Sequence, residues 1–197
     1  MTFFRKMQIN SMTKKLKAMK HNRQLNHVSD DILIKEVAMY LSLGKIYHSL
    51  KGNKKYPFAE NMYRECLRAA AGLDDAKSQY ELGKILLEEA KSRDLLEKDG
   101  LFANPSNERQ AKHLYEEAHA YLIAAEKLEH VLAKRLRGLT YINGWGVEND
   151  KDKGFELVVA SIEQEGSWDK VPQIFAAIGL NKPEFFTALM KHRGTKS

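Results

Sequence analysis

Apolar residues recur every three or four positions along most of this 197-residue chain, which is the spacing of one face of an α-helix. No segment alternates strictly between apolar and polar residues, the pattern of a half-buried strand. The sequence therefore predicts an all-α protein with little or no β-structure. The helices that this spacing predicts cover residues 32–50, 59–72, 76–87 or beyond, 111–128, 171–180 and 183–191.

Residues that start or stop helices separate these segments. Ser29, followed by two aspartates, is a predicted N-cap, residues 52–55 are a predicted turn, and Pro57 suits the first position of the next helix. The stretch 91–107 contains Gly100 and an Asn-Pro-Ser sequence, which break helices. We expect this stretch to interrupt a helical hairpin.

One turn carries a more specific pattern than the others. Gly138 precedes a Gly144-Trp145-Gly146 sequence, and Asp150 follows it. Two spaced glycines permit the positive φ of a tight turn between helices, and Asp150 can cap the helix that follows. Trp145 is expected to pack on its neighbours. The segment is therefore predicted to be the turn of a helical hairpin.

This turn resembles the Sel1-like repeat, a relative of the tetratricopeptide repeat. Its helical glycine recurs upstream, where Gly44 and Gly83 are 39 residues apart, a period that fits a helical hairpin. Only the third copy has the Gly-x-Gly turn, and Arg137 stands there where the family has leucine. The three first helices are Leu43-Gly44-x-x-Tyr47, Leu82-Gly83-x-x-Leu86 and Gly138-x-x-Tyr141; the three second helices are Ala59-x-x-Met62-Tyr63, Ala111-x-x-Leu114-Tyr115 and Gly154-x-x-Leu157-Val158.

The resemblance implies a short right-handed α-solenoid of about three Sel1-like helical hairpins with a C-terminal helical cap. The repeat domain would cover residues 30–197 and follow a basic N-terminal arm over residues 1–29. Repeat hairpins build binding surfaces, and the first helices of this family line a concave one. The residues that would then contact a partner are Ser42, Lys45, Glu81, Lys84, Lys134 and Asn143.

The resemblance also implies a function without catalysis, as a protein–protein interaction adaptor or a subunit of a multiprotein assembly. Bacterial Sel1-like proteins are often associated with secretion machinery. The specific expectation is therefore a cytoplasmic component of a bacterial secretion complex. The alternative is a nucleic-acid-associated protein that uses the basic N-terminal arm.

The positive charge of the chain is concentrated in that arm. The formal net charge is +6, yet residues 1–29 hold seven lysines and arginines and no acid, so the body is nearly neutral. Four interpretations of the arm stay open: a solvated tail, a docking element for an acidic protein, a nucleic-acid contact and a membrane-surface contact. As an amphipathic helix it would dock through the apolar face of Ile9, Met12, Leu16 and Met19 and the surrounding Lys14, Lys15, Lys17 and Lys20.

The sequence carries no recognisable catalytic constellation, and we expect neither an enzyme nor a bound metal or cofactor. Cys66 is the single cysteine, which excludes an intramolecular disulfide, and it is expected to be a buried small apolar residue. His113, Glu117 and His119 do not share one helix face, so solvated or capping histidines are expected. No apolar run approaches the roughly 18 residues of a membrane span.

Overall fold

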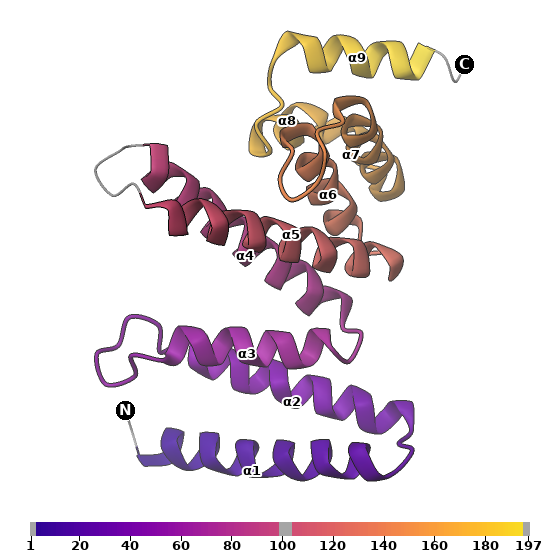
Figure 1. Ribbon diagram of the computed structural model, residues 1–197. Coiled ribbons are helices and arrows are strands. Elements are labelled where there is room, and N and C mark those ends of the chain that lie inside the picture. Colours follow the sequence, from indigo (N-terminus) through magenta and orange to yellow (C-terminus); the bar gives the residue numbers. More distant parts are fainter. Residues whose placement is uncertain (1–2, 99–103, 195–197) are drawn as a thin grey trace. The chain divides into compact units, whose positions relative to one another are not determined.

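The computed structural model describes residues 3–98 and 104–194, and within these ranges the regular elements are all helices (Figure 1). The prediction of an all-α protein is therefore confirmed. The chain divides into two compact units, one up to Ile85 and one from Leu86 onward. The elements are α1 (Phe3–Leu25), α2 (Asp30–His48), α3 (Ala59–Ala71), α4 (Ala76–Lys98), α5 (Pro105–Lys127), α6 (Val131–Asn143), α7 (Lys151–Glu165), the 3-10 helix η1 (Trp168–Lys170), α8 (Val171–Ala177) and α9 (Pro183–Gly194).

The first unit is built on the hairpin of α2 and α3, and α1 packs along α2 (Figure 1). At Gly44 the two hairpin helices come close, since a methyl group there would lie 3.3 Å from Cβ of Cys66. Cys66 is buried, as the sequence predicts. The core of the unit consists of Leu16, Leu43, Tyr47, Leu50, Ala59 and Cys66.

The helix α1 contributes to this core. Leu16 is 4% exposed, and Ile9 and Met12 pack against the same cluster. Near the end of α1, Nε of Arg23 lies 3.2 Å from Oε2 of Glu36 on α2. The apolar stripe that we expected to meet a partner thus packs within the chain. Met19 is partly buried, and Lys14, Lys15, Lys17 and Lys20 are exposed.

In the second unit, α5, α6 and α7 pack in sequence, and the helices after α7 cover the hairpin of α6 and α7. Phe175 on α8 is fully buried, with its ring centroid 6.3 Å from that of Phe155 and 5.2 Å from that of Phe186. The two C-terminal helices predicted from the sequence are therefore present and packed. The buried core comprises Leu139, Ile142, Phe155, Val158, Val159, Ile162, Val171, Phe175, Leu180 and Leu189.

The turn between α6 and α7 has the geometry that its sequence predicts. Gly144 and Gly146 both have a φ of 70°, in the left-handed region that favours glycine. Oδ1 of Asp150 accepts a hydrogen bond of 2.9 Å from the N–H of Lys153 and so caps α7. The predicted turn and its cap are confirmed.

Two predicted helix starts in the first unit need correction. Pro57 lies in a turn, and α3 begins two residues later, at Ala59. Ser29 does occupy the N-cap of α2, but its side chain makes no capping hydrogen bond. Its backbone carbonyl instead accepts from the N–H groups of Ile32 and Leu33. The predicted N-cap position of Ser29 is therefore confirmed, but its hydroxyl does not form the expected capping hydrogen bond.

The interruption predicted over residues 91–107 is shorter than expected. The helix α4 continues to Lys98, because the Lys, Arg, Leu and Glu residues of this stretch favour helix. The side chain of Asn104 then caps α5 by accepting from the N–H of Ser106. Gly100 lies outside the described residues. The stretch therefore mainly lengthens α4.

Candidate functional site

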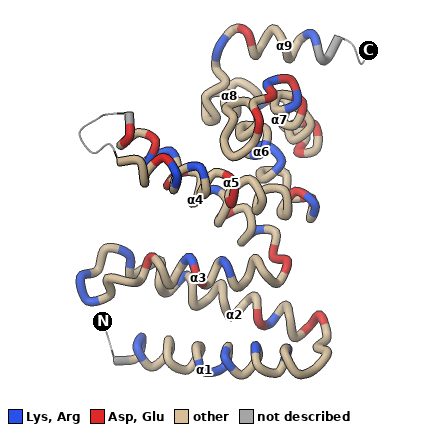
Figure 2. The backbone as a smooth tube through the Cα atoms, viewed as in Figure 1, with Lys and Arg blue, Asp and Glu red and all other residues tan. Residues whose placement is uncertain are grey.

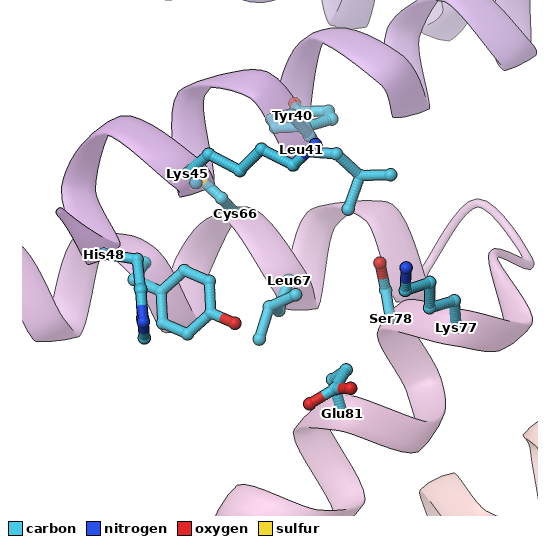
Figure 3. Close-up of a pocket in the computed structure, with 11 residues that line it drawn as sticks. Tyr40, Leu41, Lys45, His48, Cys66, Leu67, Lys77, Ser78 and Glu81 are labelled. Atoms are coloured by element: carbon cyan, nitrogen blue, oxygen red, sulfur yellow. The ribbon is translucent and has the colours of Figure 1, made fainter. Parts of the chain in front are cut away.

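The first unit carries a groove of about 360 Å³ between α2, α3 and the first turns of α4. Figure 3 shows Leu41 and Lys45 on the α2 side and Ser78 and Glu81 on the α4 side. The volume lies within the usual range of ligand pockets. The groove is lined by Tyr40, Leu41, Gly44, Lys45, His48, Tyr63, Cys66, Leu67, Lys77, Ser78 and Glu81.

Helical spacing explains why these side chains converge. Leu41, Lys45 and His48 stand at positions i, i+4 and i+7 of α2, so they share one face of that helix. Lys77 and Glu81 are likewise four residues apart on α4. Each helix therefore presents one stripe to the groove.

Side-chain hydrogen bonds fix the start of α4 beside α3. Oδ2 of Asp75 accepts from the backbone N–H and from the hydroxyl of Ser78, at 2.8 and 2.5 Å. The side-chain amide of Gln79 donates to the carbonyl of Ala71 at 3.1 Å. The chain reverses just before, at Asp74, whose φ of 59° is left-handed. The α4 wall of the groove is thus held against the end of α3.

The electrostatics of the groove favour binding over covalent chemistry. Burial, with a smaller effect of Glu65, raises the pKa of the Cys66 thiol to about 12. The thiol therefore stays protonated and unreactive near neutral pH. Burial also raises the pKa of Tyr63, and the charge of Glu81 adds to it. The groove can accept an apolar side chain, but these two groups are not activated nucleophiles.

Two of the predicted partner-contact residues, Lys45 and Glu81, line this groove. Lys84 lies almost one turn further along α4 and is exposed, without lining the groove. Ser42 on α2 is also exposed, and its hydroxyl donates to the carbonyl of Ala38 at 2.8 Å. In the first unit the structure therefore brings two of the four predicted residues into one site.

The other two predicted residues, Lys134 and Asn143, both lie on α6 in the second unit. Nζ of Lys134 donates to Oε1 of Gln164 on α7 at 2.5 Å. The side-chain amide of Asn143 donates to the carbonyl of Leu139 at 2.8 Å. Both side chains are engaged within the unit. Their contact with a partner stays a prediction.

The sequence did not identify the aromatic residues of the groove as partner-contact residues. Tyr40 lines the groove from α2, and Tyr63 lines it from α3, where its ring centroid lies 4.8 Å from that of His48. The sequence held a partial signal, because Tyr63 precedes Cys66 by three residues and so shares its helix face. Lys77 could have been found in the same way from its spacing to Glu81.

A second cluster of side chains surrounds Trp145, outside the groove. Its ring stacks on that of Tyr115, with centroids 6.0 Å apart and planes 3° apart, and Nζ of Lys91 lies 4.3 Å from its centroid. The hydroxyl of Tyr115 donates to Oδ2 of Asp94 at 2.7 Å. The expectation that Trp145 packs on its neighbours is confirmed. These contacts join α4, α5 and the turn before α7, and their role is structural.

His119 corrects the expectation of a solvated or capping histidine. Its side chain is buried, and Nδ1 lies 2.7 Å from the Thr140 hydroxyl. Because Thr140 donates its proton to the carbonyl of Arg137, Nδ1 carries the hydrogen of this contact. Burial lowers the pKa of His119, and the charges of Arg137 and Lys153 add to this effect. Within residues 3–98 and 104–194 no group of three or more His, Cys, Asp or Glu residues could hold a metal ion.

No protein-family model and no curated protein sequence matches this chain. The likeness to the Sel1-like repeat therefore rests on the residues quoted above and stays a prediction. Across the helices that the structure describes, none combines the length and the apolar character needed to cross a membrane.

Proposed function

We propose that this chain is a non-catalytic protein-interaction adaptor, or a subunit of a multiprotein assembly, and that it holds a partner segment in the groove of the first unit. The observation that carries the proposal is a groove with apolar walls and charged side chains, supplied by three helices. Much of the binding energy of protein interfaces comes from a few side chains that fill such pockets.

The charges that line the groove indicate the kind of segment that would bind. Lys45 and Lys77 are exposed there, and Glu81 is the one acidic residue among the described residues of the lining. A segment with an apolar side chain beside a carboxylate would suit this arrangement. The apolar group would lie against Leu41 and Leu67, and the carboxylate would lie near the two lysines.

The proposal includes a Sel1-like order of helical hairpins, α2–α3, α4–α5 and α6–α7. Two of the three are supported by close helix contacts at the glycines of the motif, Gly44 on α2 and Gly138 on α6. A partner in a bacterial secretion complex, and a cytoplasmic location, would follow from the resemblance alone.

The alternative, association with nucleic acid, has one observation in its favour. Lys14, Lys15, Lys17 and Lys20 are exposed on α1, a helix without acidic residues. Contacts of lysines with phosphates release counterions, so the affinity of such a complex would fall steeply with salt.

The test uses the affinity-tagged full-length chain in a lysate treated with nuclease. We expect a defined protein to be retained at fixed stoichiometry. Lys45→Glu combined with Lys77→Glu should weaken its retention about tenfold or more, because carboxylates would then repel the acidic segment. The matched control is Lys35→Glu with Lys55→Glu, which makes the same charge change at exposed positions outside the groove.

Equal retention by the two double variants would contradict the groove as the binding site. Nucleic acid recovered from an untreated lysate, without a stoichiometric protein, would favour the alternative. Circular dichroism of both variants establishes that the substitutions leave the helices intact.

A further inference from the structure

The face of α1 opposite Leu16 carries large apolar side chains near its two ends. Met7 and Leu25 each lie nine residues from Leu16, which is about half a turn around the helix. Leu16 is buried, whereas Met7 is 56% exposed and Leu25 is 69% exposed. Phe4, almost one turn before Met7, is 75% exposed. This outer face therefore presents large apolar groups at both ends of α1, with Ser11, Lys14, Ala18 and His21 between them.

Cations lie on this outer face and beside it. Figure 2 shows lysine and arginine positions along α1 and no acidic one. Within the described part of the chain, Arg23 forms an ion pair with Glu36, so its charge is already matched. The remaining cations of the helix are exposed: Arg5, Lys6, Lys14, Lys15, Lys17 and Lys20.

We propose that the outer face of α1 docks on the surface of an anionic lipid bilayer. Phe4, Met7 and Leu25 would enter the boundary between headgroups and acyl chains, the depth at which interfacial helices bury their apolar groups. Lys14 lies on this face between the two apolar ends, and Lys15 and Lys17 lie beside it. Their stems are flexible, and their ammonium groups would reach the lipid phosphates. At 1.5 Å per residue the 23 residues of α1 extend about 34 Å, long enough to lie flat across several lipids.

The pairing of α1 with α2 supports this kind of contact. Leu16 and the Arg23–Glu36 ion pair hold α1 as a helix before any membrane is met. Binding then does not have to supply the free energy of forming the helix, a cost that isolated short segments bear. The same packing sets the direction of the outer face, since it buries the opposite side. The proposal does not depend on the groove of the first unit.

An anionic bilayer fits the composition of this face better than nucleic acid does. A phosphate backbone would neutralise the lysines but leave Met7 and Leu25 in water. Single-stranded nucleic acid is bound through bases stacked on aromatic side chains, and the phenylalanines of α1 are confined to its N-terminal end, at Phe3 and Phe4. A bilayer surface offers anionic phosphates and an apolar layer together.

The experiment measures binding of the full-length chain to vesicles by sedimentation, with phosphatidylcholine alone and with equal parts of phosphatidylcholine and phosphatidylserine. We expect binding to the anionic vesicles only. Met7→Ser combined with Leu25→Ser should weaken it about tenfold or more, because the charge is unchanged but the inserted groups are lost. The matched control, Leu95→Ser with Met190→Ser, removes one leucine and one methionine that are similarly exposed, at 60% and 68%. It should bind within about twofold of the unaltered chain.

A second readout tests insertion directly. Met7→Trp should give a blue-shifted fluorescence component on adding anionic vesicles, whereas Met190→Trp should not. Failure to bind anionic vesicles would overturn the proposal. Binding that survives Met7→Ser with Leu25→Ser would overturn it too, since the contact would then be purely ionic. Competition by an oligonucleotide with no blue shift from Met7→Trp would assign the face to nucleic acid instead.

Discussion

Gly138 on α6 and Gly154 on α7 face each other across the contact between these helices. A methyl group on Gly138 would lie 2.6 Å from the carbonyl oxygen of Gly154, and one on Gly154 would lie 2.5 Å from that of Gly138. Each glycine thus leaves room for the backbone of the other helix. The close approach lets Val158 and Ile162 bury fully in the same core.

Gly138→Ala is expected to lower the free energy of unfolding by about 1–3 kcal/mol, because the two backbones must separate. Urea denaturation followed by circular dichroism measures this. Gly72→Ala is the control, since its added methyl group would lie no closer than 3.4 Å to the neighbouring atoms. Equal effects of the two substitutions would show that α6 and α7 do not need the glycine.

Gly146→Ala tests the turn between α6 and α7. The φ of Gly146 is left-handed, and a methyl group there would also collide with the backbone of Tyr115 on α5. Gly166 has nearly the same φ, 66°, with nothing within 4 Å, so Gly166→Ala isolates the conformational strain. We expect Gly146→Ala to be the more destabilising by about 1–3 kcal/mol, from thermal or urea unfolding. A smaller effect at Gly146 would contradict the packing of this turn on α5.

The sequence predicts the backbone conformation of the turn glycines but not the tertiary contact that one of them makes. The positive φ at Gly144 and Gly146 follows from a local Gly-x-Gly turn. The collision at Gly146 involves Tyr115, about thirty residues away, and depends on tertiary packing. The sequence predicts a helix over residues 76–87 or beyond and an interruption over 91–107, whereas α4 continues to Lys98. A helix breaker such as Pro105 acts at its own position, and the residues before it favour helix.

The pair of Arg23 and Glu36 tests whether α1 is part of the first unit. The Glu36 side chain is fully buried, and its Oε1 has no hydrogen-bond partner in the described structure. The ion pair with Arg23 is therefore the main interaction that offsets the burial of this charge. Arg23→Leu should cost about 3 kcal/mol by leaving a buried carboxylate unpaired. Arg23→Leu with Glu36→Leu should recover most of that loss. Lys20→Leu, at an exposed position of α1, should change stability little.

A truncation extends the same test. The sequence alone predicts that removing residues 1–26 leaves the body folded. The structure changes this expectation, because the deletion would uncover the core around Leu43 and remove the partner of Glu36. We expect a lower unfolding midpoint in urea. An unchanged midpoint would show that α1 is not needed for the stability of the first unit.

The stability of the second unit should depend on His119 below neutral pH. Its pKa is lowered in the folded chain, mainly by burial, so the unfolded chain takes up the proton at higher pH. Stability contributed by the neutral ring is complete above the ordinary value of about 6.5 and is lost as pH falls below it, by at most about 1.4 kcal/mol per pH unit. Urea unfolding between neutral and mildly acidic pH measures this slope. His119→Gln should reduce the slope, whereas His113→Gln, at an exposed position, should not.

Only part of the groove could be predicted from the sequence. Lys45 and Glu81 were identified through the repeat pattern, which places first helices on one surface. Tyr40 and His48 were missed because their role depends on how α2 meets α3 and α4, and helical spacing alone does not give that contact. Lys134 and Asn143 belong to the second unit and do not line the groove, so their contact with a partner stays a prediction.

Hydrogen–deuterium exchange of the full-length chain, alone and with its co-purified partner, tests the proposed adaptor function most directly. A segment seated in the groove should slow exchange in residues 40–48, 63–67 and 77–81, which line it, and the Lys45→Glu with Lys77→Glu variant should lose this protection. Protection confined to other helices, with these three segments unchanged, would contradict the account.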